Sequence, residues 1–548
     1  MSPLNLKKLS ELPWESRLVD RFPGDPEKRN FTRQVQNITY SEVSPTAVGS
    51  PKLIGWSEAL ASYLGILCPT SDDLLSLEVL SGNRILPTMR PYAARYGGHQ
   101  FGHWAGQLGD GRAITLGESL CGASGRFEFQ LKGAGPTPYS RRGDGRAVLR
   151  SSLREFLCSE AMHFLGVPTT RALSLVLTGN SVMRDLFYDG HPKPEPGAIV
   201  CRVSPSFLRF GHFEILAAQG EVSLLKRLAQ FLIEDHYPQI QVNDPDAFGK
   251  LLDEIARSTA EMVAHWMRVG FVHGVMNTDN MSVLGLTIDY GPYGWLESYD
   301  PQWTPNTTDA ERRRYRYGNQ PDIALWNFMR LCESFFPLIQ DEARLHRSIQ
   351  VYKETFEKSH AQMTAQKLGL SEVKSSENEK IADDLFQLLQ SSEIDYTIFF
   401  RSLCDWKVDS QPADRSPDDQ SLVDGDRSEE FLRLVSAAFY SPETLGADLR
   451  GQWASWSNRY THQIRRDGIL DAERSGRMKA ANPKYVLRNY LAQNAITAAD
   501  QGDFSVMERL LRVLKTPYDD LPHEEDLAAR RPEWARHVPG CSALSCSS

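Results

Sequence analysis

The chain has 548 residues, which is too many for one hydrophobic core, so we expect two or three domains or one large domain with appendages. Hydrophobic residues make up 41% and charged residues 24%, as in ordinary globular proteins, and the net charge of -9 argues against a nucleic-acid-binding surface. No apolar run approaches the roughly 20 residues of a membrane-spanning helix, so we predict a soluble protein. The eight cysteines are scattered without a CxxC pair, which indicates neither a zinc site nor a disulfide framework.

The first third of the chain contains short expected elements and many glycines. A helix is expected over residues 56–64, within an N-terminal region that spans residues 1–85. Residues 86–125 are rich in glycine, which predicts tight turns and a close approach of the backbone to another group. Alternating apolar and polar residues predict strands at 113–116 and 127–132, joined by a glycine-containing hairpin turn.

The rest of the chain is expected to be mainly helical. Apolar residues at helical spacing predict helices over residues 147–165 and 246–269, each followed by a glycine. A short pair of strands with a turn between them is expected over residues 271–289. Beyond residue 320 the apolar pattern again favours helices.

The strongest chemical signal is the segment from His273 to Asn280, which is followed by Asp289-Tyr290-Gly291. Protein kinases carry His-Arg-Asp, then an Asn, then Asp-Phe-Gly, and the Asn and the second Asp hold metal ions. The same offset between His273 and Asn280 predicts that Asn280 and Asp289 bind Mg²⁺ or Mn²⁺. A polar turn between two strands is the alternative, but it does not account for the matched spacing on both sides of Asn280.

This segment departs from a kinase at Val275, which stands where a kinase places its catalytic Asp. A valine side chain has no atom that accepts a proton. Asp279 is the nearest carboxylate, and we therefore predict that Asp279 acts as the general base.

A second signal is a lysine on a strand followed by a glutamate on a helix. Lys132 ends the polar face of the second expected strand, and Glu155 lies on the next expected helix. Kinases pair such residues to position phosphates. Because strands often end in lysine and helices often carry glutamate, this signal depends on the downstream loop for its weight.

Glycines and basic residues surround this lysine, and backbone amides and guanidinium groups suit phosphate oxygens. Their spacing matches neither a Gly-x-Gly-x-x-Gly loop nor the Walker pattern, and solvated turns are the usual explanation. For Arg202 and Arg209, a buried structural ion pair is an equal alternative to nucleotide binding. For His99 and His103, packing or hydrogen bonding is favoured over metal binding because no carboxylate or Cys has matching spacing. The candidate phosphate-binding residues are Gly109, Gly111, Arg112, Asp144 and Gly145.

Together these residues resemble the SelO family (selenoprotein O and its Cys-containing relatives), which are protein adenylyltransferases with a pseudokinase fold. The resemblance covers nearly the whole chain beyond residue 40 and extends to the tail, where some members carry selenocysteine at the position of Cys546. The matching stretches are residues 96–112, 127–165, 198–213, 273–296 and 319–331.

The resemblance implies an α+β, protein-kinase-like fold with two lobes. An N-terminal extension that wraps the rest would span residues 1–85, and an N-lobe with the Glu155 helix would span 86–200. A C-lobe with the catalytic loop would span 201–400, and a helical C-terminal region with a polar, Cys-containing tail would span 401–548.

The resemblance also implies the reaction and the roles of the site residues. AMP would pass from ATP to Ser, Thr or Tyr hydroxyls of target proteins, because ATP sits inverted relative to a kinase and pyrophosphate leaves. Asp279 would be the base, Asn280 and Asp289 would hold the metal, and Lys132 would pair with Glu155. The nucleotide would be bound by Gly109, Gly111, Arg112, Lys132, Asp144, Gly145, Arg202 and Arg209.

Two other functions stay open: an atypical kinase that transfers the γ-phosphate to a small molecule or a protein, and a scaffold that binds ATP without turnover. The complete set of metal and phosphate residues argues against a scaffold. We expect a monomer with protein substrates and without nucleic-acid or membrane partners. The resemblance implies a mitochondrial location, although residues 1–33 make a poor presequence, and the cytoplasm is the alternative. A redox role for Cys546 is a hypothesis suggested by its polar terminal setting.

Overall fold

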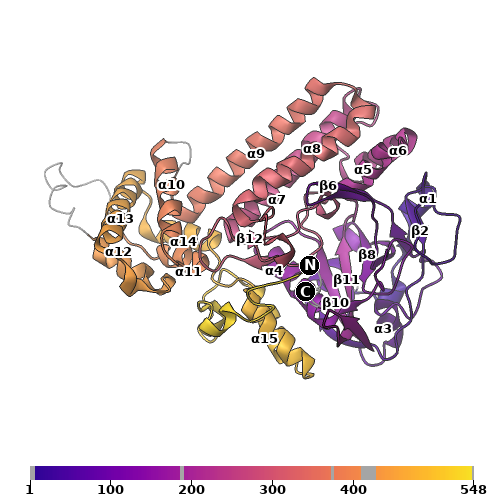
Figure 1. The fold of residues 1–548 in the computed structure, drawn as a ribbon, viewed down its shortest axis with the longest axis horizontal. Helices are drawn as coiled ribbons and strands as arrows, with labels where there is room; N and C mark the ends of the chain where they lie inside the picture. Colours follow the sequence, from indigo (N-terminus) through magenta and orange to yellow (C-terminus); the bar gives the residue numbers. More distant parts are fainter. Residues whose placement is uncertain (1–5, 186–189, 372–375, 409–426, 546–548) are drawn as a thin grey trace.

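The computed structural model describes residues 6–185, 190–371, 376–408 and 427–545. It joins one large antiparallel sheet to many helices, so the predicted α+β class is confirmed. In Figure 1 the sheet and the N-terminal residues lie on one side of the molecule, and three long helices, α7, α8 and α9, run side by side across the middle. The helices from α10 to α14 form the opposite end.

The sheet contains nine strands among the described residues, in the order β2-β4-β7-β8-β11-β10-β3, with β1 beside β7 and β9 beside β11. Two small two-stranded sheets, β5-β6 and β12-β13, lie apart from it. The strands are β1 (Trp14–Glu15), β2 (Tyr40–Glu42), β3 (Lys52–Trp56), β4 (Tyr92–Ala94), β5 (Gly97–Gln100), β6 (His103–Gln107), β7 (Ala113–Leu120), β8 (Arg126–Lys132), β9 (Ala147–Val148), β10 (Arg171–Arg184), β11 (Lys193–Ser204), β12 (Phe271–Val272) and β13 (Gly294–Trp295).

Helices α1 to α4 lie between strands of the large sheet along the chain, and helices dominate the chain after β11. They are α1 (Arg17–Arg21), α2 (Glu58–Leu64), α3 (Leu74–Leu80), α4 (Leu149–Phe164), α5 (Phe210–Ala218), α6 (Val222–His236), α7 (Ala247–Val269), α8 (Gln320–Ile339), α9 (Glu342–Leu368), α10 (Ser376–Gln390), α11 (Tyr396–Leu403), α12 (Ser428–Val435), α13 (Ala447–Asp467), α14 (Asp471–Ala481), α15 (Asn489–Asp500) and α16 (Ser505–Leu514).

The predicted hairpin is confirmed. Strands β7 and β8 pair antiparallel, with Ala113 opposite Lys132 and Leu120 opposite Arg126. Strand β7 is longer than the expected residues 113–116, because its later residues also find partners on β8 and β1.

The two faces of β8 lie in different surroundings, as its alternating sequence predicts. Phe129 and Leu131 pack into a core with Trp14 and residues of α2 and α3. The opposite face carries Gln130 and Lys132, which are buried although they are polar. This polar face therefore has to find its partners inside the protein.

Helix α4 lies against the sheet and is buried along most of its length. It contacts β10 and β11 of the sheet and also α15 and α16 from the far end of the chain. The expected helix over residues 147–165 begins two residues late, because Ala147 and Val148 pair with β11 as strand β9. Burial on several sides makes α4 an unusual helix, since it carries the charged side chains of Glu155 and Glu160 inside the protein.

The expected pair of strands within residues 271–289 is wrong. Strand β12 pairs instead with β13, which lies beyond Asp289. Residues Thr278–Asn280 form a 3-10 turn, and the residues after it bond to other parts of the chain. Phe210 N donates to Met281 O, and Thr287 N donates to Pro168 O, so the segment has no free edge to pair with itself.

The N-terminal residues and the C-terminal tail both join the main body. Strands β2 and β3 take part in the large sheet, through β4 and β10. Leu544 in the tail accepts a hydrogen bond through its backbone oxygen from Thr307 N at 2.8 Å. Cys546 lies outside the described residues. No described helix has both the length and the apolar composition that a membrane crossing requires.

Candidate active site

Asp279 lies in a 3-10 turn that follows α7 and β12. Its Oδ2 accepts a hydrogen bond from Gln100 Nε2 at 3.3 Å, while its buried Oδ1 has no hydrogen-bond partner among the described residues. Its backbone oxygen accepts from Arg209 Nη1 at 2.9 Å. Burial raises the pKa of Asp279 to about 7, against the opposing charge of Arg209. A carboxylate with one unpaired oxygen is placed to accept a proton.

Hydrogen bonds within the loop around Asp279, and one bond to the β5–β6 hairpin, hold this loop in place. His273 Nε2 bonds to Ile288 O at 2.9 Å, and Asn280 Nδ2 donates to Val275 O at 2.9 Å. Thr278 Oγ1 accepts from the backbone N of His99 at 2.7 Å. These bonds join the loop to itself and to the β5–β6 hairpin, so its shape is defined before any ligand binds.

Asn306 contacts the same loop, and its neighbour Thr307 contacts Leu544 of the C-terminal tail. Asn306 Nδ2 donates to Gly274 O at 3.0 Å, and the neighbouring residue Thr307 bonds through both its N and its Oγ1 to Leu544 O. A side chain at Gly274 would meet Pro292 O at 2.3 Å, and the φ of Gly274 is 77°, so glycine is required there.

Asp289 forms the centre of a charged cluster. Its Oδ1 accepts from Arg202 Nη1 at 2.7 Å, and its Oδ2 accepts from Arg209 Nη1 at 2.5 Å. Burial alone would raise the pKa of Asp289, but the guanidinium groups of Arg209 and then Arg202 hold that pKa well below its usual range. Its φ of 60° lies in the left-handed region, which is uncommon for a residue other than glycine and occurs at functional sites.

The same cluster includes the predicted lysine and glutamate. Lys132 Nζ lies 2.6 Å from Glu155 Oε2, and Arg202 Nε lies 2.7 Å from Glu155 Oε1. The sheet register brings Arg202 there, since it stands opposite Gln130 on β8, two residues before Lys132. Burial lowers the pKa of Lys132 to about 8, although the charge of Glu155 opposes this shift.

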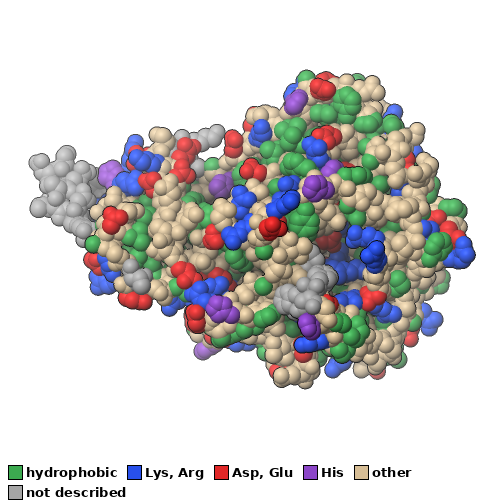
Figure 2. All heavy atoms as spheres, in the orientation of Figure 1, with side chains coloured by type: hydrophobic (Ala, Val, Ile, Leu, Met, Phe, Trp, Pro, Cys, Tyr) green, Lys and Arg blue, Asp and Glu red, His purple; other side chains and the backbone are tan. Residues whose placement is uncertain are grey.

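The structure thus brings together Lys132, Glu155, Arg202, Arg209 and Asp289, with Asp279 attached through Arg209. In Figure 2, Lys and Arg side chains gather over the region where Figure 1 places β8. The buried ion-pair alternative for the two arginines is confirmed, because both bond to Asp289, and their binding of a nucleotide stays a prediction.

The predicted glycines have a different explanation. A side chain at Gly109 would meet the Tyr139 ring at 2.5 Å, and one at Gly111 would meet Tyr139 O at 2.8 Å. Gly145 has φ 69°, and its Cβ would meet Gly135 O at 2.1 Å. The close approach that requires glycine is thus to the protein itself at all three positions.

The described hydrogen bonds and ion pairs join Asp144 to none of the residues of this cluster, whereas the backbone of Arg112 lies next to Lys132. Asp144 is half-exposed and receives two hydrogen bonds from Arg184, at 2.7 and 2.8 Å. The side chain of Arg112 is exposed, and its backbone oxygen accepts from Gly133 N, next to Lys132. Its charge contributes to the lowered pKa of Lys132.

Several contributors were not foreseen. Gln100 bonds to Asp279, Tyr315 Oη donates to Asn277 in the loop, and the Arg209 guanidinium lies 4.7 Å from the ring of Tyr96. Only the glycine-rich composition around residues 96–111 hinted at this region. His99 packs against Trp104 and Trp326, and its Nδ1 bonds to Glu214 at 2.6 Å, as the packing or hydrogen-bonding interpretation predicts. No cluster of three His, Cys, Asp or Glu residues suited to a metal occurs in the part of the chain that the structure describes.

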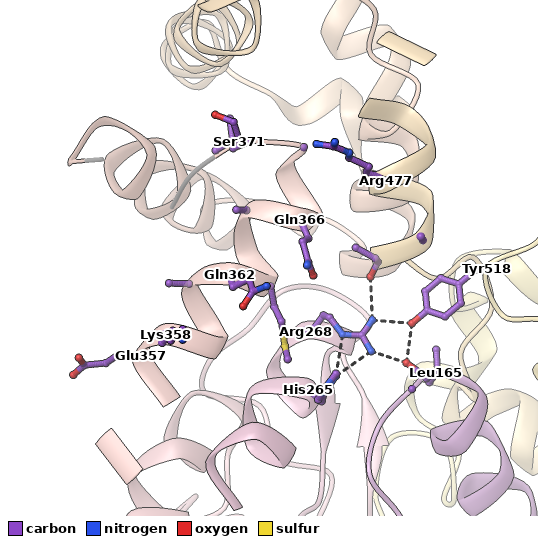
Figure 3. Close-up of a pocket in the computed structure, with 18 of the residues that line it drawn as sticks. Leu165, His265, Arg268, Glu357, Lys358, Gln362, Gln366, Ser371, Arg477 and Tyr518 are labelled. Atoms are coloured by element: carbon purple, nitrogen blue, oxygen red, sulfur yellow. Dashed lines mark hydrogen bonds between the residues drawn. The ribbon is translucent and has the colours of Figure 1, made fainter. Parts of the chain in front are cut away.

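A large cavity lies away from this cluster, where α4, α7, α9 and α14 meet (Figure 3). Its volume is about 1480 Å³. Arg268 lies on its wall and donates to Leu165 O, Ala481 O and Tyr518 Oη, so its guanidinium stabilises the junction of these helices. None of the residues of the charged cluster lines this cavity.

Comparison with known proteins gives the relationship of this chain. A match to the family described as "Protein adenylyltransferase SelO" spans residues 28–515. The chain belongs to the SelO family. "Protein nucleotidyltransferase YdiU" of Nitrosospira multiformis is 57% identical over 100% of this chain and 98% of that protein.

Other SelO relatives are similar over the same extent. The proteins of the same name from Xanthomonas campestris pv. campestris and Rhodopirellula baltica are 53% and 52% identical, each over 98% of this chain, and the matches cover 100% and 99% of those proteins. The predicted family is therefore confirmed, and it is a family of protein nucleotidyltransferases.

Proposed function

We propose that this chain is a protein adenylyltransferase that transfers AMP from ATP to Ser, Thr or Tyr hydroxyls of target proteins. The observation that carries the proposal is the charged cluster itself. Lys132, Arg202 and Arg209 face two carboxylates, Glu155 and Asp289, beside a loop that offers Asp279 in place of the missing base at Val275. Membership of the SelO family supports the same activity.

The basic side chains would bind the phosphates of ATP. Two guanidinium groups and one ammonium group neutralise negative charge strongly when they are buried, because the surroundings screen them little. Arg202 and Arg209 now bond to both oxygens of Asp289, so a bound nucleotide would share these donors with the carboxylate. Arg112 would add charge at the exposed margin, while Gly109, Gly111, Asp144 and Gly145 would shape the adjoining turns.

Asn280 and Asp289 would hold Mg²⁺ or Mn²⁺ together with phosphate oxygens. The donor set fits, since Asp289 is ionised and Asn280 uses its Nδ2 to bond to Val275 O, which leaves its Oδ1 as a possible ligand. Magnesium in nucleotide-binding enzymes is ordinarily held by one or two protein oxygens and the phosphates. When bound, the ion would neutralise charge on the phosphates of the leaving group.

Asp279 would act as the general base. The acceptor hydroxyl gives its proton to Oδ1 of Asp279 while its oxygen forms a bond to the α-phosphorus of ATP. The bond between the α-phosphorus and the bridging oxygen breaks, and pyrophosphate leaves with both electrons. Gln100 keeps the other carboxylate oxygen occupied and so orients the free one.

A kinase-like fold with two lobes is the structural part of the proposal. A sheet that carries Lys132, a helix beneath it that carries Glu155, and a helical body that carries the loop of Asp279 correspond to the parts of a kinase. The boundaries at residues 85, 200 and 400 and the monomeric state stay predictions. The mitochondrial location also stays a prediction, and the bacterial relatives do not support it.

The test uses ATP labelled separately at the α- and γ-phosphates, with Mg²⁺ or Mn²⁺ and a mixture of acceptor proteins. We expect protein labelling from the α position alone, and we expect Asp289→Ala to abolish it. Labelling from the γ position would show that the chain is a kinase and would contradict the inverted position of ATP.

A further inference from the structure

The β5–β6 hairpin stands outside the large sheet and reaches over the loop of Asp279. Its turn consists of Phe101 and Gly102, which have φ of 51° and 86°, as in the tight turns of two-residue hairpins. Phe101 N donates to Tyr315 Oη at 2.9 Å, and Tyr315 in turn donates to Asn277 at 2.6 Å. The hairpin, the loop and the segment before α8 therefore form one continuous surface.

On that surface two arginines enclose one indole ring. The guanidinium carbons of Arg314 and Arg330 lie 4.7 and 5.0 Å from the centre of the Trp326 ring. His99 packs against the same ring at 5.4 Å and against Trp104 at 5.1 Å. We call these five residues the hairpin–helix surface: His99 and Trp104 from the hairpin, Arg314 from the loop before α8, and Trp326 and Arg330 from α8.

The arginines of this surface are partly exposed, and Trp104 is exposed. The Nε atoms of Arg314 and Arg330 are buried and have no hydrogen-bond partner among the described residues, and Arg330 Nη2 pairs with Glu333 at 2.6 Å. Trp104 is 40% exposed, which is unusual for so large an apolar side chain. An exposed tryptophan beside partly exposed arginine side chains is typical of protein-binding surfaces.

The charge of the surface indicates what it binds. The chain as a whole has a net charge of -9, yet Arg312 and Arg313 directly precede Arg314, which packs on the same Trp326 ring as Arg330. Arg312 and Arg313 are both exposed. In Figure 2, basic and histidine side chains gather where Figure 1 places β6. Carboxylates are the natural partners of planar guanidinium groups.

We infer that the hairpin–helix surface docks an acidic segment of the target protein and so presents a neighbouring hydroxyl to Asp279. This inference rests on the proposed function and names the class of acceptor. A single-stranded nucleic acid would also suit arginine and aromatic side chains. An acidic peptide is favoured because the surface adjoins the residue that would deprotonate a protein hydroxyl.

The test measures binding separately from transfer. Three fluorescent peptides carry one central Ser, flanked by Glu, by Gln or by Lys, and a single-stranded uridine oligonucleotide serves as the nucleic-acid probe. We expect wild type to bind the Glu peptide at least about tenfold more tightly than the Lys peptide, with an affinity that falls with salt. The double variant Arg314→Gln/Arg330→Gln should lose about five- to tenfold of that affinity.

Two further variants make the result specific. Arg477→Gln removes a helix arginine that, like Arg330, pairs with a nearby glutamate, and it should leave peptide binding unchanged. Arg330→Glu should shift the preference toward the Lys peptide, which a merely unstable variant would not do. Equal binding of the three peptides, no binding of any, an equal loss in Arg477→Gln, or tighter binding of the oligonucleotide would overturn the inference.

The transfer assay keeps the two proposals apart. If the Glu peptide binds as expected but receives no label from the α-phosphate of ATP, the proposed function fails and the docking surface stands. If all three peptides are labelled at equal rates and the double variant labels them equally well, the docking surface fails and the proposed function stands.

Discussion

Removal of the Glu155 carboxylate should weaken both the fold and ATP binding. Glu155 is 3% exposed and Lys132 is 8% exposed, so Glu155→Ala leaves a buried ammonium group without its carboxylate. Breaking a buried pair in this way costs about 3–5 kcal/mol of the free energy of unfolding. Lys132 can instead lose its proton and become neutral. For a lysine with an ordinary pKa of 10.5, deprotonation at pH 7 costs about 5 kcal/mol, which is the upper limit of the loss of stability from the unpaired ammonium group.

Glu155→Ala should also lower the affinity for ATP. A neutral or displaced Lys132 forfeits a charge-assisted bond to a phosphate, worth about 1.5–3 kcal/mol, so the affinity for ATP should fall about ten- to hundredfold. Glu155→Gln keeps the size and one acceptor oxygen, and it should lose less of both. Urea unfolding measures the stability, and titration calorimetry with ATP measures the affinity.

Glu160 on the same helix provides the matched control. It is fully buried and pairs with Arg171 at 2.5 and 2.6 Å, but it does not contact Lys132. Glu160→Ala should reduce the free energy of unfolding by a similar amount and leave the intrinsic affinity for ATP unchanged. An equal loss of ATP affinity in both variants, or no loss in Glu155→Ala, would refute the assignment of Lys132 and Glu155 to the nucleotide.

Three other predictions follow from single residues. Asp279→Asn should slow AMP transfer by about 10²–10⁴-fold with ATP affinity retained in calorimetry, and near-normal turnover would contradict its role as base. Burial lowers the pKa of His212 to about 3, so the folded state resists its protonation, and His212 should contribute about 1.4 kcal/mol per pH unit to the fall in the free energy of unfolding below pH 6.5. Urea titrations over a pH series measure this slope, which should be smaller in His212→Gln; an unchanged slope would contradict the assignment. Gly145→Ala should lower the thermal midpoint because its Cβ would overlap a backbone oxygen, whereas Gly476→Ala on an exposed face of α14 should raise stability by about 0.5–1 kcal/mol; a shift in the same direction for both would contradict this reasoning.

Local patterns predicted the elements that position the site. The alternation in residues 127–132 predicted β8 and which of its faces is polar, and helical spacing predicted α4 and α7 closely. The short segment after α7 was predicted wrongly, because its hydrogen bonds run to Leu208, Phe210 and Pro168. Such partners are set by the tertiary fold, and a strand pattern within a few residues contains no record of them.

Among the site residues, too, local sequence patterns predicted some, and the tertiary fold alone places the others. Kinase-like spacing predicted Asn280 and Asp289 as site residues, and Asp279 was predicted as the nearest carboxylate, because all three lie close together in the sequence. Gln100 lies 179 residues from Asp279 in sequence, so the contact between them could not be predicted from spacing. A glycine signals only that the backbone approaches something closely; at Gly109 that neighbour is Tyr139, and composition alone does not distinguish it from a phosphate.

The most direct test identifies the product that forms from ATP during the reaction. Phosphorus NMR of a reaction with ATP, Mg²⁺ and acceptor protein identifies which product accumulates as the protein becomes modified. We predict pyrophosphate, in proportion to the modified protein, and no turnover by Asp289→Ala. Accumulation of ADP in its place would contradict AMP transfer and would assign the charged cluster to a kinase reaction.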